Sequence, residues 1–123
     1  MEQKHICPVE STLELIGGKY KALILWHLSS GTLRFNQLQK LLPNATPRML
    51  TLQLRELEKQ ELVQRTVYAQ VPPKVEYSMT QLGQSLMPIL TAMRDWGAAY
   101  LRSQDIEPNC VMMSDCSVEK QEP

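Results

Sequence analysis

The chain has 123 residues, of which 43% are hydrophobic, and its 13 Lys and Arg balance 13 Asp and Glu. That length predicts a single domain with an ordinary core, and the absence of any run of about 18 apolar residues argues against a membrane span. Residues 1–10, MEQKHICPVE, contain no apolar signal segment, so we expect a cytoplasmic protein. In that setting the three cysteines are expected to be thiols at rest.

The zero net charge conceals a strong asymmetry along the chain. Residues 19–80 carry nine Lys and Arg against four Glu, a balance of +5, whereas residues 1–18 and 81–123 have balances of −2 and −3. Affinity for nucleic acid depends on local neutralisation of phosphates. The middle segment is therefore the part of the chain that could bind DNA.

Two helices are expected at the start of the chain. The first begins at Cys7-Pro8, because proline suits the first helical position, and ends at Gly17-Gly18. The second lies within residues 19–29, KYKALILWHLS, and is apolar on most sides. Such a helix is expected at the centre of a core.

A short strand and a short helix follow. Leu33 is a possible one-residue strand, and residues 35–42 form the helix, which Pro43 interrupts. Three leucines of this helix are expected to face inward: Leu38, Leu41 and Leu42.

The next helix begins at Thr46-Pro47, where the threonine hydroxyl can cap the helix and proline needs no N–H partner. At about 100° per residue, its leucines line one face. The opposite face carries three cations and a hydroxyl at the spacing needed to follow a DNA groove. The inward residues are Leu50, Leu54 and Leu57, and the outward ones are Arg48, Thr51, Arg55 and Lys59.

Two strands are expected after this helix. Residues 62–68 and 75–79 alternate apolar with polar side chains, and Pro72-Pro73 cannot lie in a central strand, so we predict a hairpin with Lys74 at its tip. The predicted order of elements is helix, helix, short strand, helix, helix and hairpin. This order is the winged helix-turn-helix arrangement. The fold class is therefore mainly α with a small β-hairpin wing.

A long helix is expected from Thr80 to about Arg102, followed by a flexible acidic tail over residues 103–123. Apolar residues recur along the helix at spacings of four and three, which is typical of a coiled-coil seam. We expect this seam to pack on a second copy of the chain with help from the first helix, and Pro88 to kink the helix or loosen its first turns. The dimerisation residues are then Leu82, Leu86, Ile89, Met93, Trp96 and Tyr100.

Over about residues 7–101 the chain resembles the HxlR family of bacterial winged-helix transcriptional regulators, which are similar in fold to the MarR group. The matching segments are CPVESTLELIGGKYKALILWHL, LRFNQLQKLLPNATPRMLTLQLRELEKQELVQR, and YAQVPPKVEYSMTQLGQSLMPIL followed by DWG. The resemblance implies a homodimeric DNA-binding regulator, and several family members respond to oxidants or electrophiles through the cysteine before the first helix, here Cys7. Two features differ from the family: the tail with Cys110 and Cys116, and the apolar Leu52 on the otherwise polar helix face.

Arg48, Thr51 and Arg55 could simply form a solvated helix face. The adjoining wing and the resemblance favour contacts in the major groove, with Arg48 or Arg55 the expected reader of guanine O6 and N7. Leu52 could touch a thymine methyl group or pack nearby.

Four further residues complete the predicted DNA-binding set. Arg34 and Asn36 begin the short helix, where they would meet phosphate or alternatively cap the helix. Lys74 would lie beside a phosphate or in a narrow minor groove, or is an exposed turn lysine. The fourth residue is Thr46, at the start of the recognition helix.

Cys7 is the candidate redox-sensing residue. The helix dipole favours the thiolate of a cysteine at a helix N-terminus, and the thiolate can accept an N–H bond, which raises its nucleophilicity. Lys4 and His5 would help and Glu10 would oppose this effect. The commoner fate of a lone cysteine is a small buried residue without chemistry. The resemblance favours sensing, in which oxidation or alkylation shifts the first helix and alters the distance between two recognition helices.

No metal site is predicted. Cys110 and Cys116 have a wider spacing than zinc sites usually show, and the only histidines are His5 and His27. His27 lies in the most apolar helix and is expected to be a core or interface residue.

We predict that residues 7–102 form a DNA-binding domain with its dimerisation helices, and that a homodimer binds a palindromic operator, repressing by default. The sequence has no glycine-rich phosphate loop and no Ser/His/Asp set in a plausible context, so neither an enzyme nor a cofactor is predicted. The alternative is a winged-helix module that binds a protein or a small ligand without sequence-specific DNA binding.

Overall fold

Six helices and one three-stranded sheet make up the part of the chain that the computed structural model describes, residues 6–108. The chain divides into two units, one ending at Gln84 and one beginning at Ser85, and each is considered by itself. Within the described residues, no helix is long and apolar enough to cross a membrane.

The first unit begins with helices α1 (Pro8–Ile16) and α2 (Lys21–Leu28). Pro8 occupies the first turn of α1 and Gly17 is its C-terminal cap, so both predicted boundaries are confirmed. The side chains that α2 contributes to the core are almost completely buried: Ile24, Leu25 and Leu28. This helix is the centre of the core, as its all-round apolar sequence predicts.

Strand β1 (Leu33–Arg34) leads directly into helix α3 (Phe35–Leu41). Leu38 and Leu42 are buried, but the prediction for Leu41 is wrong because its side chain is exposed. The helix ends at Leu41, and Leu42 leaves the helical conformation with φ −125° and ψ 66°. Because the backbone changes direction at this point, the next residue after Leu38 to point into the core is Leu42 and not Leu41.

Helix α4 (Pro47–Lys59) begins as predicted. The Thr46 hydroxyl accepts a hydrogen bond from the Met49 N–H at 3.1 Å, which satisfies a donor that the helix leaves unpaired. At the other end Glu61 adopts a left-handed conformation, φ 64°, and the Leu62 N–H donates to the Leu57 carbonyl at 2.9 Å. This Schellman closure turns the chain sharply from α4 into the next strand.

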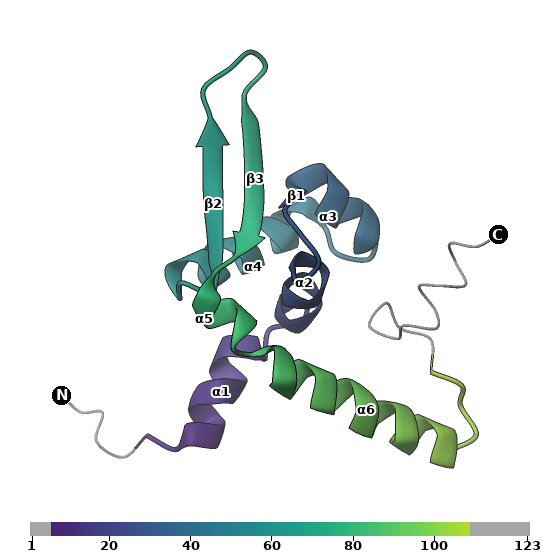
Figure 1. Ribbon diagram of the computed structural model, residues 1–123. Coiled ribbons are helices and arrows are strands. Elements are labelled where there is room, and N and C mark those ends of the chain that lie inside the picture. The colour runs from purple at the N-terminus through teal and green to yellow at the C-terminus, as the bar shows by residue number, and fades with distance from the viewer. Residues whose placement is uncertain (1–5, 109–123) are drawn as a thin grey trace. The chain divides into compact units, whose positions relative to one another are not determined.

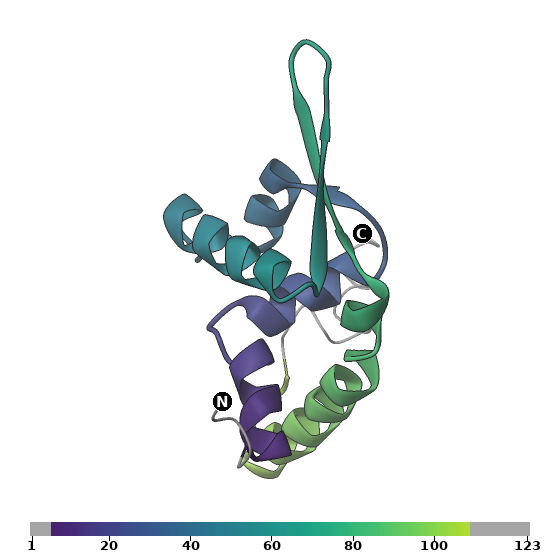
Figure 2. The same ribbon diagram turned by 90° about the vertical axis from the view of Figure 1, so that its left-hand side faces the viewer.

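Strands β2 (Val63–Tyr68) and β3 (Lys74–Met79) form an antiparallel hairpin, here called the wing, and β1 pairs with the other edge of β3 to give the order β1-β3-β2. The outer half of the wing extends past the helices of this unit (Figures 1 and 2). Lys74 is the first residue of β3, opposite Tyr68, and not the loop tip that the sequence predicted. The described fold is a winged helix-turn-helix.

The predicted long helix is wrong in one respect, because the chain forms two helices, α5 (Gln81–Gln84) and α6 (Met87–Ser103). Thr80 caps α5 as expected, accepting from the Gly83 N–H at 3.0 Å. Pro88 cannot donate to the carbonyl of Gln84 and its ring would clash there, so a continuous helix is broken at this point. Pro88 instead lies in the first turn of α6, where proline is tolerated.

Leu86 is a further correction. The sequence placed it on the coiled-coil seam that packs on a second copy, but it caps α6 at the break between the two helices and is only 7% exposed within its own chain. Leu82 lies on α5, so it does not belong to the same helix face as the residues of α6. The exposed apolar face is therefore shorter than predicted and begins at Ile89.

Two polar contacts attach α4 to α2 and the residues before it. The Lys21 side chain is buried, 5% exposed, and its Nζ lies 2.6 Å from Glu56 Oε1. One turn earlier on α4, Gln53 Oε1 accepts the Tyr20 N–H at 3.2 Å. A Cβ at Gly18 would lie 2.6 Å from Gln53 Oε1, so a side chain at this position would displace the Gln53 amide from its present place. These contacts fix how α4 lies on α2.

The hydrogen bond and charge of Lys21 lower the pKa of Glu56 below its ordinary value of 4.5. A carboxyl group with a lowered pKa in the folded state stabilises that state above its unfolded pKa. The contribution disappears as the pH falls through the folded value.

We expect Glu56→Gln to lower stability at neutral pH, because the buried Lys21 ammonium loses its charged partner. The variant should also lose less stability on acidification than the wild type below pH 4.5. Urea midpoints measured from about pH 3 to pH 7 test both effects. Glu58→Gln, on the same helix, is the control and should follow the wild-type profile. Superimposable profiles of Glu56→Gln and wild type would contradict the assignment.

Candidate nucleic-acid interface

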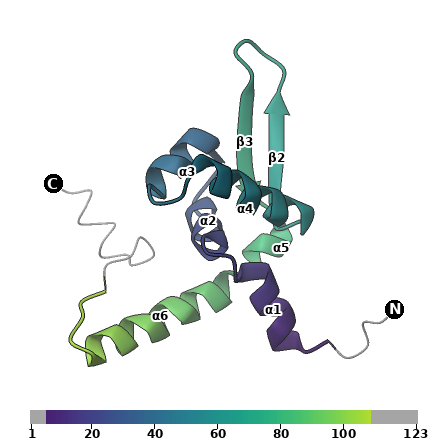
Figure 3. The ribbon, with the colours of Figure 1, turned by 180° about the vertical axis from the view of Figure 1, so that it is seen from behind.

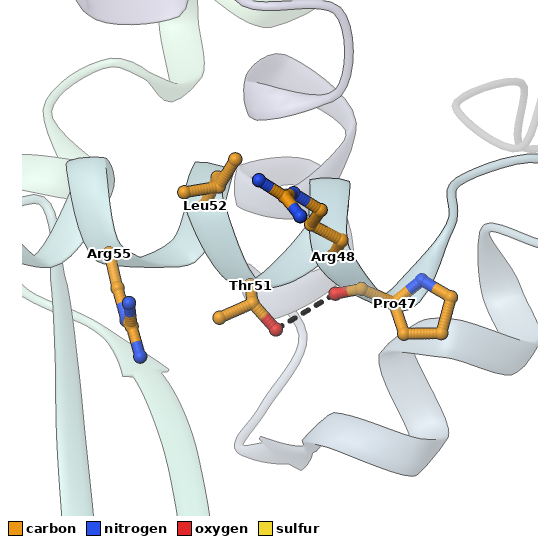
Figure 4. A pocket seen from close by; sticks show the side chains of 5 residues that line it. All are labelled: Pro47, Arg48, Thr51, Leu52 and Arg55. Atoms are coloured by element: carbon orange, nitrogen blue, oxygen red, sulfur yellow. Dashed lines mark hydrogen bonds between the residues drawn. The ribbon is translucent and has the colours of Figure 1, made fainter.

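The candidate interface is the outer face of α4, defined by Arg48, Thr51, Leu52 and Arg55. With Pro47 these side chains line a shallow, open depression of about 370 Å³ (Figure 4). Figure 4 shows Arg48 and Leu52 along one edge of the helix and Thr51 and Arg55 along the other. The opposite side of the same helix buries its leucines completely or almost so. Burial of one side therefore presents the other side to solvent.

Both arginines of the outer face are exposed, as the sequence predicted. Among residues 6–108, no carboxylate forms an ion pair with the guanidinium of Arg48 or Arg55. Lys59 is also exposed, one turn beyond Arg55. Within the described part of the chain, ion pairs therefore leave the charge of these two guanidiniums unneutralised.

Thr51 differs from the expectation of a free hydroxyl. Its Oγ1 donates to the carbonyl of Pro47 at 2.8 Å, within the helix. Only the oxygen's acceptor capacity remains for a ligand. Thr51 can therefore accept a hydrogen bond from a base amino group or present its methyl group.

Arg34 and Asn36 lie at the start of α3, which adjoins the N-terminal end of α4 (Figure 3). The sequence left open whether the Arg34 and Asn36 side chains contact phosphate or cap the helix. The Arg34 N–H donates to Gln37 Oε1 at 2.8 Å, so the Gln37 side chain supplies a cap at this end of the helix. The Arg34 and Asn36 side chains are both exposed. They remain available to phosphate oxygens.

The cations of the wing are arranged differently from the prediction. Lys74 Nζ lies 3.5 Å from Glu76 Oε2 and 4.9 Å from the centre of the Tyr68 ring, so part of its charge is used within the wing. Arg65, an exposed cation on β2, was not singled out from the sequence. A basic residue within an alternating strand is the signal that could have identified it.

Cys7 is an exposed free thiol and the N-terminal cap of α1, as predicted. Its carbonyl accepts the Ser11 N–H at 3.0 Å, but its side chain makes no capping hydrogen bond, contrary to the predicted thiolate contact. The structure therefore offers accessibility and the helix dipole at this thiol. Lys4, His5, Cys110 and Cys116 lie outside the described residues.

The exposed face of α6 consists of Ile89, Met93, Trp96 and Tyr100. The Trp96 and Tyr100 rings stack with their centres 5.5 Å apart, and Trp96 is 71% exposed. A separate apolar row on α1 is exposed too, at Val9 and Leu13. Exposed apolar surface of this kind is typical of an interaction face.

His27 is half-buried, and burial lowers its pKa below the ordinary 6.5 because desolvation disfavours the charged ring. Within the described part of the chain its Nε2 has no hydrogen-bond partner. In the same residues, no group of three His, Cys, Asp or Glu is arranged to hold a metal ion.

Comparisons with known proteins match this fold. A family model described as an HxlR-like helix-turn-helix matches residues 15–105. The chain is 57% identical over 94 residues to the uncharacterised HTH-type transcriptional regulator YdeP of Bacillus subtilis (strain 168), covering 76% of this chain and 73% of YdeP.

Two solved structures are similar as well. The redox regulator HypR in its oxidised form superposes with a TM-score of 0.72 and 54% identity, covering 76% of this chain and 96% of that chain. The HTH-type transcriptional regulator YtcD of Bacillus subtilis (strain 168) superposes with a TM-score of 0.76 and 50% identity, covering 79% of this chain and 99% of that chain. By sequence and by fold, this chain belongs to the HxlR-like helix-turn-helix family of transcriptional regulators.

Proposed function

We propose that this protein is a transcriptional regulator that binds a twofold-symmetric DNA operator as a homodimer. The observation that carries the proposal is the outer face of α4, where two exposed guanidiniums without an ion-pair partner among residues 6–108 stand opposite a fully buried leucine row. Relatives named as HTH-type transcriptional regulators support it. Such a regulator would act in the cytoplasm with the DNA, and repression by occluding a promoter is the simplest mechanism.

In this proposal α4 enters the major groove of each half-site, and the two copies of α4 lie about 34 Å apart in successive grooves. Arg48 or Arg55 donates to guanine O6 and N7, which form the acceptor pair that a guanidinium matches best. Arg34 and Asn36 contact phosphate at the start of α3, and Thr46 orients the first turn of α4. The wing follows the backbone beside the groove with Lys74 and Arg65.

The homodimer would form through the exposed apolar face of α6 together with the apolar row of α1. Trp96 and Tyr100 are large, flat and exposed, and such aromatic residues are enriched at protein interfaces. Covering these side chains on a second copy would remove them from water, which is the main favourable term in protein association.

Cys7 is the proposed sensor within this dimer. An exposed thiol at the first turn of α1 is reachable by oxidants and by electrophilic quinones. Because α1 also carries part of the proposed dimer surface, modification at Cys7 would bias the distance between the two copies of α4. HypR, which is named a redox regulator, supports a response of this kind.

Replacing Arg55 or Arg48 by alanine tests the DNA proposal. Removing a guanidinium that contacts phosphate should lower the slope of log affinity against log salt by about one. Removing one that reads a base should instead cost about 1–3 kcal/mol of binding free energy and relax the sequence specificity at one position. Mobility shifts at two salt concentrations, on fragments selected from random DNA, measure both quantities. Arg102→Ala, on α6, is the control with the same charge change. Failure of the wild type to select any fragment would favour a protein-binding or ligand-binding module.

Cys7→Ser tests the sensor. A thiol oxidant or a quinone should change the DNA affinity of the wild type and leave that of Cys7→Ser unchanged, because only the wild type carries the reactive sulfur at α1. A variant with Cys110→Ser and Cys116→Ser should respond like the wild type. Equal responses of wild type and Cys7→Ser would remove Cys7 from the mechanism.

A further inference from the structure

Leu52 is the anomalous residue of α4. Leu52 is 49% exposed, whereas the other three leucines of this helix, Leu50, Leu54 and Leu57, are at most 1% exposed. Its neighbours on the helix surface are Arg48, one turn before, and Arg55, just under one turn after. A large apolar side chain thus stands in water between two cations.

The direction of Leu52 is set by the helix itself. At about 100° per residue, the direction of Leu52 differs by roughly 170° from the mean direction of Leu50, Leu54 and Leu57. Arg48 and Arg55 lie further round the helix, nearer its flanks. Of the four residues of the outer face, Leu52 therefore projects most directly away from the core, toward the floor of any groove that α4 enters.

The chemistry of the groove floor limits what Leu52 can contact there. Base edges in the major groove present hydrogen-bond donors and acceptors, and one apolar group, the C5-methyl of thymine. An apolar protein partner is disfavoured at this position because it would bury Arg48 and Arg55 as well, and unpaired buried charges are costly. A polyanion with an apolar group on the groove floor suits all three side chains.

We infer that Leu52 packs against the C5-methyl group of a thymine in each half-site of the operator. This inference rests on the proposed function and adds a specificity to it: a T·A pair at the centre of the α4 footprint, flanked by the contacts of Arg48 and Arg55. Leu52 has no donor or acceptor in its side chain, so it would recognise the pyrimidine by its methyl group alone.

Substituting uracil for thymine tests the inference, because uracil keeps every base-pairing and groove hydrogen-bonding group and lacks only the methyl. In a fragment that the wild type selects from random DNA, each thymine is replaced singly. At one thymine per half-site the wild type should lose about fourfold in affinity, the effect of one buried methyl group. Replacing both should cost about fifteenfold.

Leu52→Ala provides the second arm of the cycle. The substitution is on the surface and alanine favours helix, so the fold is retained. The variant should bind thymine and uracil fragments equally, while Arg55→Ala should keep the uracil effect. If no uracil position affects the wild type, or if the effect persists in Leu52→Ala, the inference is overturned and DNA binding stands. If the wild type selects no DNA, the proposed function itself fails.

Discussion

The rotation of α4 about its own axis determines what the molecule can present to a partner. Three leucines buried on one side hold this rotation, because turning the helix by one residue would move them into water at a cost of about 1.5–3 kcal/mol each. Two polar contacts fix the same rotation, the Lys21–Glu56 ion pair and the hydrogen bond from the Tyr20 N–H to Gln53. Each of them is made in only one orientation of α4. The outer face of α4 is exposed as a consequence.

The elements around α4 are positioned by the same helix. The Thr46 cap sets where α4 begins, next to α3, and the left-handed Glu61 sets where it ends, directly before β2. Because only two residues separate the C-terminal cap of α4 from the start of the sheet, the wing has little freedom relative to the helix. The helix face and the wing therefore act as one surface.

Much of this unit could be predicted from the sequence, because its signals are local. Thr46 and Pro47 mark the start of a helix, and Leu50, Leu54 and Leu57 at a period near 3.6 identify its buried face without knowledge of the partner elements. The exposed positions of Arg48 and Arg55 follow from the same periodicity.

The features that could not be predicted depend on residues far apart in sequence or on competition between two signals. Lys21 lies in the most apolar helix, and its partner Glu56 is 35 positions later, so no local pattern pairs them. At Pro88 the sequence predicted a kink or loosened first turns within one long helix, but the backbone requirement of proline ends one helix and begins another there, with Leu86 buried at the break. Lys74 belongs to β3, where it is paired with Tyr68 of β2, and its ammonium contacts the Tyr68 ring and Glu76.

Methylation interference at guanine N7 tests the central claim most directly, because N7 lies in the major groove and its methylation leaves Watson–Crick pairing intact. On a fragment bound by the wild type, methylation should block binding at guanines in two symmetric patches about one helical turn apart. In the variant that lacks the base-reading arginine, Arg48 or Arg55, each patch should lose one sensitive guanine. Binding that is indifferent to N7 methylation, or a single patch, would contradict a dimer that reads DNA through α4.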